Sequence, residues 1–161
     1  MTELEAQQLE KLRSVLDQNG AEYRILENGS NLASAEDGAH SGLGALDEMA
    51  PTFILRSKIG YIAAIARGDT RLSYKKIKQH FGLKDVSLAS PEEVQELTGA
   101  AVGYVALINP GLPTIVDERL LEKPLVYGGT GVLSHTLAAA PAVIIKCTEA
   151  EVFDFCELKT A

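Results

Sequence analysis

The segment 97–117 reads LTGAAVGYVALINPGLPTIVD, and no charged side chain occurs in it before the closing Asp117. A neutral run of this length is compatible with a membrane span, a buried core segment, or a loop whose backbone makes recognition contacts. Glycines and prolines interrupt the run, so a lipid-exposed helix would leave backbone groups unpaired, and the membrane interpretation fails. We expect the segment to begin at a helix end and to finish in a strand, TIVD (114–117). The interrupting residues are Gly99, Gly103, Pro110, Gly111 and Pro113.

The sequence before this segment predicts short helices and strands in mixed order. Thr2 and Glu5 form a capping box for an N-terminal helix, whose leucine stripe stops near Gly20. Two apolar runs, 52–55 and 61–66, predict a β-hairpin with Gly60 in the connection. Further helices are expected at 34–44, begun by Ser34, at 72–82, ended by Gly82, and at 90–99, capped by Ser90 with Pro91 and Glu93 behind it.

The sequence after it adds further short elements. PLVYGG (124–129) predicts a strand and a turn, and VLSHTL (132–137) predicts another strand. From Pro141 onward the prediction stays open between a helix that this proline begins and a strand that the β-branched residues of AVIIKC favour. Because strands and helices do not alternate regularly, we expect an α/β domain of the mixed α+β type, with residues 1–161 forming one domain.

The composition narrows the classes of protein to consider. The chain has 161 residues, of which 46% are hydrophobic, and a formal net charge of -7, which suits one globular domain and does not suit a DNA-coating protein. Cys147 and Cys156 have neither CxxC spacing nor nearby histidines, so we expect reduced thiols, no metal site and no cofactor. The polar N-terminus MTELEAQQLEKL is not a signal peptide, so we expect a cytoplasmic protein with no membrane partner.

Several motifs occur in an order that is typical of one family. They are ASAEDGA, RGDTRLSYKKIKQHFG, VSLASPEEVQELTG, LPTIVDERLL and VYGGTGVLSHTL. With them the chain resembles the YbaK and prolyl-tRNA synthetase editing-domain family. The resemblance implies a compact domain with a curved, partly closed mixed sheet flanked by helices. It also implies hydrolysis of aminoacyl esters on mischarged tRNA. The implied partners are the acceptor end of a tRNA that carries an amino acid and, as a further candidate, an aminoacyl-tRNA synthetase.

The resemblance gives the neutral segment a role. In such domains a G-x-x-x-P element lines the aminoacyl pocket with its backbone, and here it aligns with Gly103 to Leu107, with leucine in place of the proline. Tyr104 and Val105 belong to this loop and are candidate substrate contacts, although Tyr104 is equally interpretable as a core residue. A neutral loop suits an uncharged ester, and glycine lets a backbone approach a ligand closely.

A second departure from the family pattern lies at the start of the hairpin. The family usually has a lysine directly before a threonine there; Thr52 is retained and Pro51 stands at the lysine position. The later glycine pair of the family survives as Gly128 and Gly129. We therefore expect the pocket between the Thr52 strand, the Gly103 loop and the Gly128 turn. Gly103 and Thr52 are the candidate catalytic positions.

Other side chains are candidates on weaker grounds. In LSHTL, strand alternation puts Ser134 and His135 on opposite faces, and His135 is interpretable as a substrate contact, a general base or a structural residue. Arg71, Lys75 and Lys78 recur at helical spacing and are candidate phosphate contacts for the acceptor stem. The alternative for these three cations is a solvated helix face.

Two functions remain open from the sequence. The first is a trans-editing aminoacyl-tRNA deacylase, in which backbone N–H groups near Gly103 stabilise the carbonyl oxygen while water attacks. The second is a non-catalytic domain that binds aminoacyl-tRNA or a small amino-acid-like ligand. The absence of a lysine at Pro51 favours the second.

Overall fold

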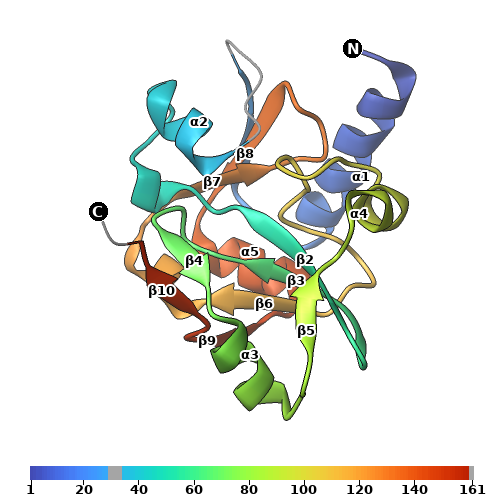
Figure 1. The fold of residues 1–161 in the computed structure, drawn as a ribbon. Coiled ribbons are helices and arrows are strands. Elements are labelled where there is room, and N and C mark those ends of the chain that lie inside the picture. The colour runs from blue at the N-terminus through green and yellow to red at the C-terminus, as the bar shows by residue number, and fades with distance from the viewer. Residues whose placement is uncertain (29–33, 160–161) are drawn as a thin grey trace.

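The computed structural model describes residues 1–28 and 34–159, and it has the expected mixed α+β architecture (Figure 1). Its helices are α1 (Glu3–Gln18), α2 (Ala35–His40), α3 (Tyr74–Phe81), α4 (Pro91–Thr98) and α5 (Pro141–Thr148), with 3-10 helices η1 (Leu46–Glu48) and η2 (Glu118–Glu122). Its strands are β1 (Tyr23–Glu27), β2 (Thr52–Ser57), β3 (Gly60–Ile65), β4 (Thr70–Leu72), β5 (Val86–Leu88), β6 (Thr114–Asp117), β7 (Val126–Gly129), β8 (His135–Ala139), β9 (Glu151–Phe153) and β10 (Cys156–Leu158).

These strands form a central mixed sheet and two smaller sheets. The central sheet has the order β5-β2-β3-β6-β9, with antiparallel pairing around the expected β2–β3 hairpin and parallel pairing of β6 with β3 and of β9 with β6. A three-stranded antiparallel sheet has the order β1-β8-β7, and β10 pairs with β4. The hairpin therefore brings Thr52 to the start of a strand in the middle of the central sheet.

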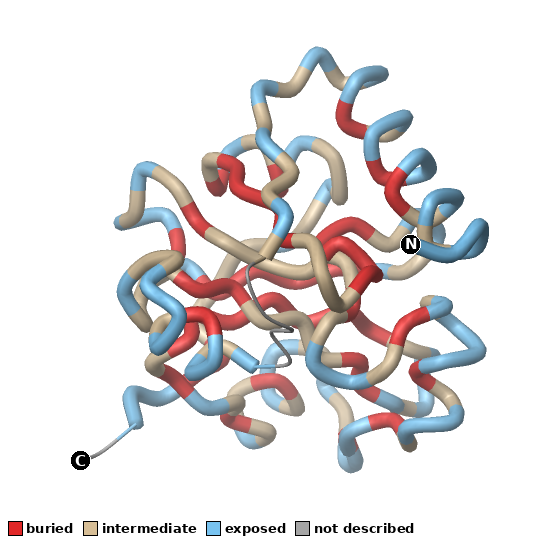
Figure 2. The backbone as a smooth tube through the Cα atoms, turned by 90° about the horizontal axis from the view of Figure 1, so that it is seen from above, coloured by how far each residue is buried: buried red, intermediate tan, exposed pale blue. Residues whose placement is uncertain are grey.

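Three apolar clusters hold these layers together. Leu12 and Leu16 of α1 pack with Val126 and Leu137 of the three-stranded sheet, and Figure 2 shows the buried stripe of α1 on an otherwise exposed helix. A second cluster surrounds Phe155, which is fully buried between the central sheet and α3. The third cluster packs α4 and the loop that follows it against the hairpin. Burial of large apolar side chains in this way supplies most of the stability of such a domain.

The capping signals in the sequence are confirmed at most helix ends. Thr2 and Ser90 form capping boxes with Glu5 and Glu93, and Ser34 begins α2. Gly82 and Gly99 end α3 and α4 in the left-handed conformation, which glycine adopts without strain. Of the helix and the strand that the sequence left open from Pro141 onward, the structure has the helix, α5. Proline suits the first turn of a helix, and burial of Ile144 outweighs the strand preference of the β-branched residues.

Three expectations from the sequence need correction. Gly128 and Gly129 are the last residues of strand β7 and do not form a turn. Arg71 lies in β4 opposite Glu157, so it does not share a helical face with the lysines of α3. The strand expected at 132–137 begins only at His135, because the preceding residues form a turn in which Thr130 accepts a hydrogen bond from the Val132 N–H.

The two cysteines are free thiols, as expected. Cys156 is fully buried, and this burial raises the pKa of its thiol to about 12. A thiol with so high a pKa stays protonated near neutral pH and is a poor nucleophile. Among the described residues, no helix has the length and apolar character needed to cross a membrane, and no group of three potential metal ligands is present.

Gly129 is the position where the fold tolerates a side chain least. A Cβ atom there would lie 2.0 Å from the carbonyl oxygen of Val105, which is backbone and cannot turn aside. We expect Gly129→Ala to lower the free energy of unfolding by about 3 kcal/mol, in the upper range for overpacked sites. Chemical denaturation monitored by circular dichroism measures this loss.

Gly128→Ala is the matched control for that substitution. Its Cβ would meet only side-chain atoms of Leu107, the nearest at 2.5 Å, and a side chain can shift more easily than backbone. The loss of stability should therefore be smaller for Gly128→Ala than for Gly129→Ala. Equal stability of wild type and Gly129→Ala would contradict the close approach of the two backbones.

Candidate functional site

Two adjacent cavities lie where α2, the start of β2 and the loop after α4 meet. The smaller has a volume of about 60 Å³ and the larger a volume of about 260 Å³. They share part of their walls, so a ligand that bridges them would pass along the shared residues. Those residues are Ser34, Ala35, Pro51, Thr52, Gly103 and Val105.

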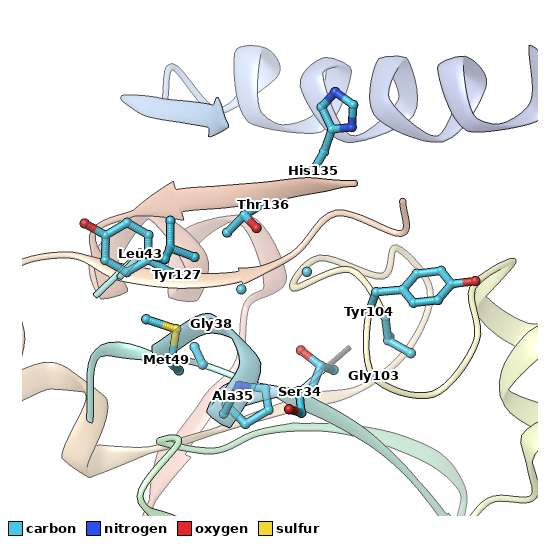
Figure 3. A pocket seen from close by; sticks show the side chains of 16 residues that line it. Ser34, Ala35, Gly38, Leu43, Met49, Gly103, Tyr104, Tyr127, His135 and Thr136 are labelled. Carbon is cyan, nitrogen blue, oxygen red and sulfur yellow. The ribbon is translucent and has the colours of Figure 1, made fainter. Parts of the chain in front are cut away.

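The smaller cavity is closed by the three-stranded sheet on one side and by α2 on the other (Figure 3). Its walls include Gly38 of α2, Met49 just before the hairpin, and Tyr127 and Thr136 of β7 and β8. Thr136 is buried, and its hydroxyl donates a hydrogen bond to the Asn28 side chain at 2.7 Å. The remaining walls combine apolar side chains with polar atoms, and the small volume limits the size of an occupant.

The larger cavity has a more apolar wall. Phe53 and Ile54 of β2, Leu88 of β5, and Val94 of α4 line it together with Val102 of the following loop. Leu88 and Val102 are 52% and 56% exposed, so apolar surface continues from the cavity to the solvent. A flat apolar or aromatic group, such as a nucleobase, suits walls of this kind.

The loop that separates the two cavities is held by backbone contacts with β7 and the turn after it. The Leu107 N–H donates to the Gly129 carbonyl at 3.0 Å, and the Gly131 N–H donates to the Tyr104 carbonyl at 3.0 Å. Gly103 has φ +108°, a conformation that residues with side chains rarely adopt. Glycines therefore occur on both sides of this contact, Gly103 in the loop and Gly129 and Gly131 in β7 and the turn after it.

Polar groups without a partner gather on the shared wall. The Thr52 hydroxyl oxygen is buried and has no hydrogen-bond partner within the described part of the chain. Across residues 1–28 and 34–159, no acceptor is present for the backbone N–H of Gly103 or of Val105. Of these residues, Gly103 is exposed and Val105 is buried. A buried polar group without a partner, such as the Thr52 hydroxyl, is rare in folded proteins, and at a cavity wall it suits a ligand that supplies the missing bond.

Pro51 has a structural role at the edge of the site. It precedes β2, and its carbonyl accepts a hydrogen bond from the Ala66 N–H at 3.0 Å. Proline is tolerated before the first residue of a strand because no ladder bond needs its missing N–H. The wall at this position therefore carries a ring in place of a cation.

The remaining expected contacts differ in how they lie. His135 contributes to the smaller cavity, but its ring points towards α1 and away from Gly38 and Met49, and the Tyr104 ring points outward (Figure 3). Ser134 is absent from the described walls of both cavities; its hydroxyl lies 2.9 Å from Nδ1 of His135. The geometry therefore favours the backbone of the Tyr104 loop over these rings as the part that faces a ligand.

The cations proposed for phosphate contacts lie apart from the cavities. Lys75 and Lys78 belong to α3, at the end of the molecule opposite α2, and Arg71 belongs to β4 (Figure 1). None of these three residues lines either cavity. Arg71 nevertheless follows Thr70, which lines the larger cavity.

Sequence reasoning named four residues of the shared wall and missed Ser34, Ala35 and several neighbours. Ser34 and Gly38 belong to the motif ASAEDGA, which signalled the family but not the cavity. Tyr127 lies in the motif VYGGTGVLSHTL and Met49 lies in none of the motifs, and a parallel bridge brings the two residues together. Lys159 lines the larger cavity from the end of the chain, where the sequence gives no signal.

Comparison with protein families agrees with this arrangement. Residues 30–147 match the model of a family described as the aminoacyl-tRNA editing domain. The chain is 25% identical over 153 residues to the multifunctional Ser/Thr-tRNA deacylase ProXp-y of Escherichia coli strain K12, with 91% of each protein covered. It is also 33% identical over 134 residues to the proline–tRNA ligase of Treponema denticola, covering 82% of this chain and 20% of that ligase.

The proline–tRNA ligases are much longer than the region they share with this chain. The ligase of Moorella thermoacetica is 36% identical over 84 residues, which are 52% of this chain and 14% of the ligase. The chain thus spans a small part of these relatives, and their whole activity does not transfer with the match.

Solved structures share the fold. A candidate trans-editing enzyme for prolyl tRNA synthetase superposes with a TM-score of 0.84 at 24% identity, covering 98% of this chain and 99% of that one. A hypothetical protein superposes with a TM-score of 0.85 at 30% identity, covering 91% of this chain and 99% of that one.

The position of Gly103 between the cavities leads to a test. We expect Gly103→Val to abolish hydrolysis or binding of aminoacyl-tRNA, because the added side chain would stand at the shared wall and force a different loop conformation. Radiolabelled aminoacyl-tRNA in a filter assay measures both activities.

Gly111→Val is the matched control. Gly111 has φ +89° in the same loop, meets open space and lines neither cavity, so it carries similar strain without a place in the site. Both variants should lose similar thermal stability, and only Gly103→Val should lose activity. Wild-type activity in Gly103→Val would exclude this residue from the site.

Proposed function

The chain belongs to the aminoacyl-tRNA editing domain family, and we propose that it hydrolyses the ester that joins a wrong amino acid to the 3′ end of a tRNA. The partner is then the aminoacylated acceptor end, and the reaction needs no cofactor. Acting in trans on released tRNA, beside an aminoacyl-tRNA synthetase in the cytoplasm, is part of the same proposal. Residues 1–161 would work as one domain.

One observation carries this proposal: unpartnered hydrogen-bonding groups lie on the wall between two cavities. These groups are the Thr52 hydroxyl and, within the described residues, the N–H groups of Gly103 and Val105. An aminoacyl ester has its reactive carbonyl between an amino-acid side chain and a nucleoside. A site with a compartment for each and free polar groups between them suits that substrate.

The two cavities differ in volume, as do the two halves of an aminoacyl ester. The smaller cavity, of about 60 Å³, would receive the amino-acid side chain and exclude larger ones by volume. The larger cavity, of about 260 Å³ and apolar, would receive the terminal adenosine. A cavity that discriminates by volume alone separates substrates that differ by one methylene only about 10- to 200-fold. A narrow cavity is needed to reach even that discrimination.

The reaction then follows from these positions. A water molecule attacks the ester carbonyl carbon, and the N–H groups of Gly103 and Val105 stabilise the negative charge that develops on the carbonyl oxygen. Removal of one such donor typically slows a reaction by about 10²- to 10³-fold. The bond to the ribose oxygen breaks, and that oxygen takes up a proton from the attacking water. Thr52 would hold the water or the amino group through its free hydroxyl.

No side chain of the shared wall is suited to act as a strong base. Ser34 uses its hydroxyl to accept from the Asp37 N–H at 3.0 Å, and the His135 ring points away from the cavity centre. We propose that the neighbouring ribose hydroxyl of the substrate assists the water. Catalysis would thus come mainly from positioning and from stabilisation of charge.

A second candidate function is supported by Pro51. Where the family usually has a lysine, this chain presents a ring that neither donates a hydrogen bond nor carries charge. A domain that binds aminoacyl-tRNA or a small amino-acid-like ligand without hydrolysing it would keep the cavities and dispense with that cation.

Deacylation of a panel of mischarged tRNAs separates the two functions. We expect at least one tRNA carrying a small amino acid to lose it faster with the chain than in buffer alone, with Gly103→Val as the inactive reference. Binding of such tRNAs without faster hydrolysis would reject the enzyme and support the binding domain.

Pro51→Lys tests what the missing cation contributes. Hydrogen bonds to charged groups are worth roughly 1.5–3 kcal/mol, so we expect kcat/KM to rise about 10- to 100-fold for at least one tRNA of the panel. Proline before β2 leaves no ladder bond to restore, so the melting temperature should change little. Pro51→Gln, which adds length without charge, is the control and should give a smaller gain. Inactivity of both wild type and Pro51→Lys would favour the binding domain.

A further inference from the structure

Lys159 brings a positive charge to the larger cavity from the end of the chain. Within the described residues, it is the one lysine or arginine in the wall of either cavity. It lies beyond β10, which pairs with β4, and its N–H donates to the Asp69 carbonyl at 3.0 Å. This backbone contact fixes Lys159 beside β4, where the residue lines the cavity.

The ammonium group of Lys159 has two hydrogen-bond acceptors, both on residues that line the larger cavity. Its Nζ lies 2.6 Å from a carboxylate oxygen of Glu36 and 3.3 Å from the carbonyl oxygen of Gly68. An ammonium has three N–H donors, so one of them remains for another acceptor. The side chain is 43% exposed, so solvent and a ligand reach it.

The ion pair with Glu36 does not by itself account for this position. Glu36 is 49% exposed, and ion pairs between exposed side chains contribute little to stability. The hydrogen bond from Lys159 lowers the pKa of the Glu36 carboxyl, so this carboxylate is charged at neutral pH. A chain with net charge -7 repels a nucleic acid, and a cation at the mouth of the cavity offsets that repulsion locally.

We propose that Lys159 binds the phosphate of the terminal nucleotide when an RNA 3′ end occupies the larger cavity. This inference rests on the proposed function, because it takes the same RNA end as the ligand. Lys159 then positions the substrate through a contact that is equally strong before and during hydrolysis. It supplies from the C-terminal segment a cation that the wall lacks at Pro51.

The test measures binding and turnover in parallel. A fluorescein-labelled single-stranded RNA ending in CCA is titrated with wild type and with Lys159→Gln at several salt concentrations, and anisotropy reports the affinity. We expect Lys159→Gln to weaken binding about fivefold at low salt. We also expect the slope of log K against log salt to fall by about 0.7, the value for one phosphate contact with a single strand.

Turnover gives a readout that a merely structural role would not produce. For the tRNA hydrolysed fastest, Lys159→Gln should raise KM and leave kcat unchanged, as expected for a contact made equally in the ground and transition states. Lys159→Arg, which keeps the charge, should restore the affinity and the salt slope. An unchanged slope in Lys159→Gln would overturn the inference and leave the deacylase intact.

Two control variants separate a phosphate contact at Lys159 from a general effect of charge and from loss of the ion pair. Lys58→Gln makes the same change of charge in the exposed hairpin connection and should leave the slope unchanged. Glu36→Gln breaks the ion pair but keeps the ammonium, so it should bind the RNA at least as tightly as wild type. If Glu36→Gln weakens binding as much as Lys159→Gln, the ion pair acts only by holding α2 and the C-terminal segment together, and the inference is wrong.

The outcomes also separate the two proposals. A wild-type protein that binds the RNA through Lys159 but does not hydrolyse aminoacyl-tRNA keeps the inference and loses the deacylase. A wild-type protein that neither binds the RNA nor hydrolyses any tRNA overturns both.

Discussion

The site depends on the close approach of two backbones, that of Gly129 and that of Val105. A Cβ atom at Gly129 would lie 2.0 Å from the Val105 carbonyl oxygen, so only glycine allows the loop that contains Gly103 to lie against β7. This contact orders an otherwise irregular neutral segment, in which Gly103 and Val105 line both cavities. A charged side chain would be costly at the buried positions of this segment, such as Val105, Leu107 and Ile108.

Much of the fold could be predicted because its signals are local. Caps at Thr2, Ser34 and Ser90 and stops at Gly82 and Gly99 are properties of single helix ends, and they were correct. The glycines of β7 were expected in a turn, since glycine usually marks one. Their actual role depends on a segment that lies well before them in the sequence, and no local pattern reveals such a contact.

The cavity walls could be predicted only in part for the same reason. Thr52, Gly103 and the glycine pair were expected together through resemblance to a family, and all four residues line the smaller cavity. Met49 and Lys159 reach the cavities through pairing of distant segments, which sequence spacing does not encode. Arg71 was placed on a helix by its spacing from Lys75, but pairing of β4 with β10 takes that residue into a strand.

The central claim is that the two cavities receive the two halves of an aminoacyl ester, with its carbonyl at the Gly103 loop. A crystal structure with a non-hydrolysable amide analogue of 3′-aminoacyl-adenosine tests this most directly. We expect the amino-acid side chain in the smaller cavity, the adenosine in the larger one, and the amide oxygen within about 3.2 Å of a loop N–H, which is hydrogen-bond distance. An analogue bound elsewhere, such as the groove lined by Arg56, Lys58 and Lys84, would contradict the account.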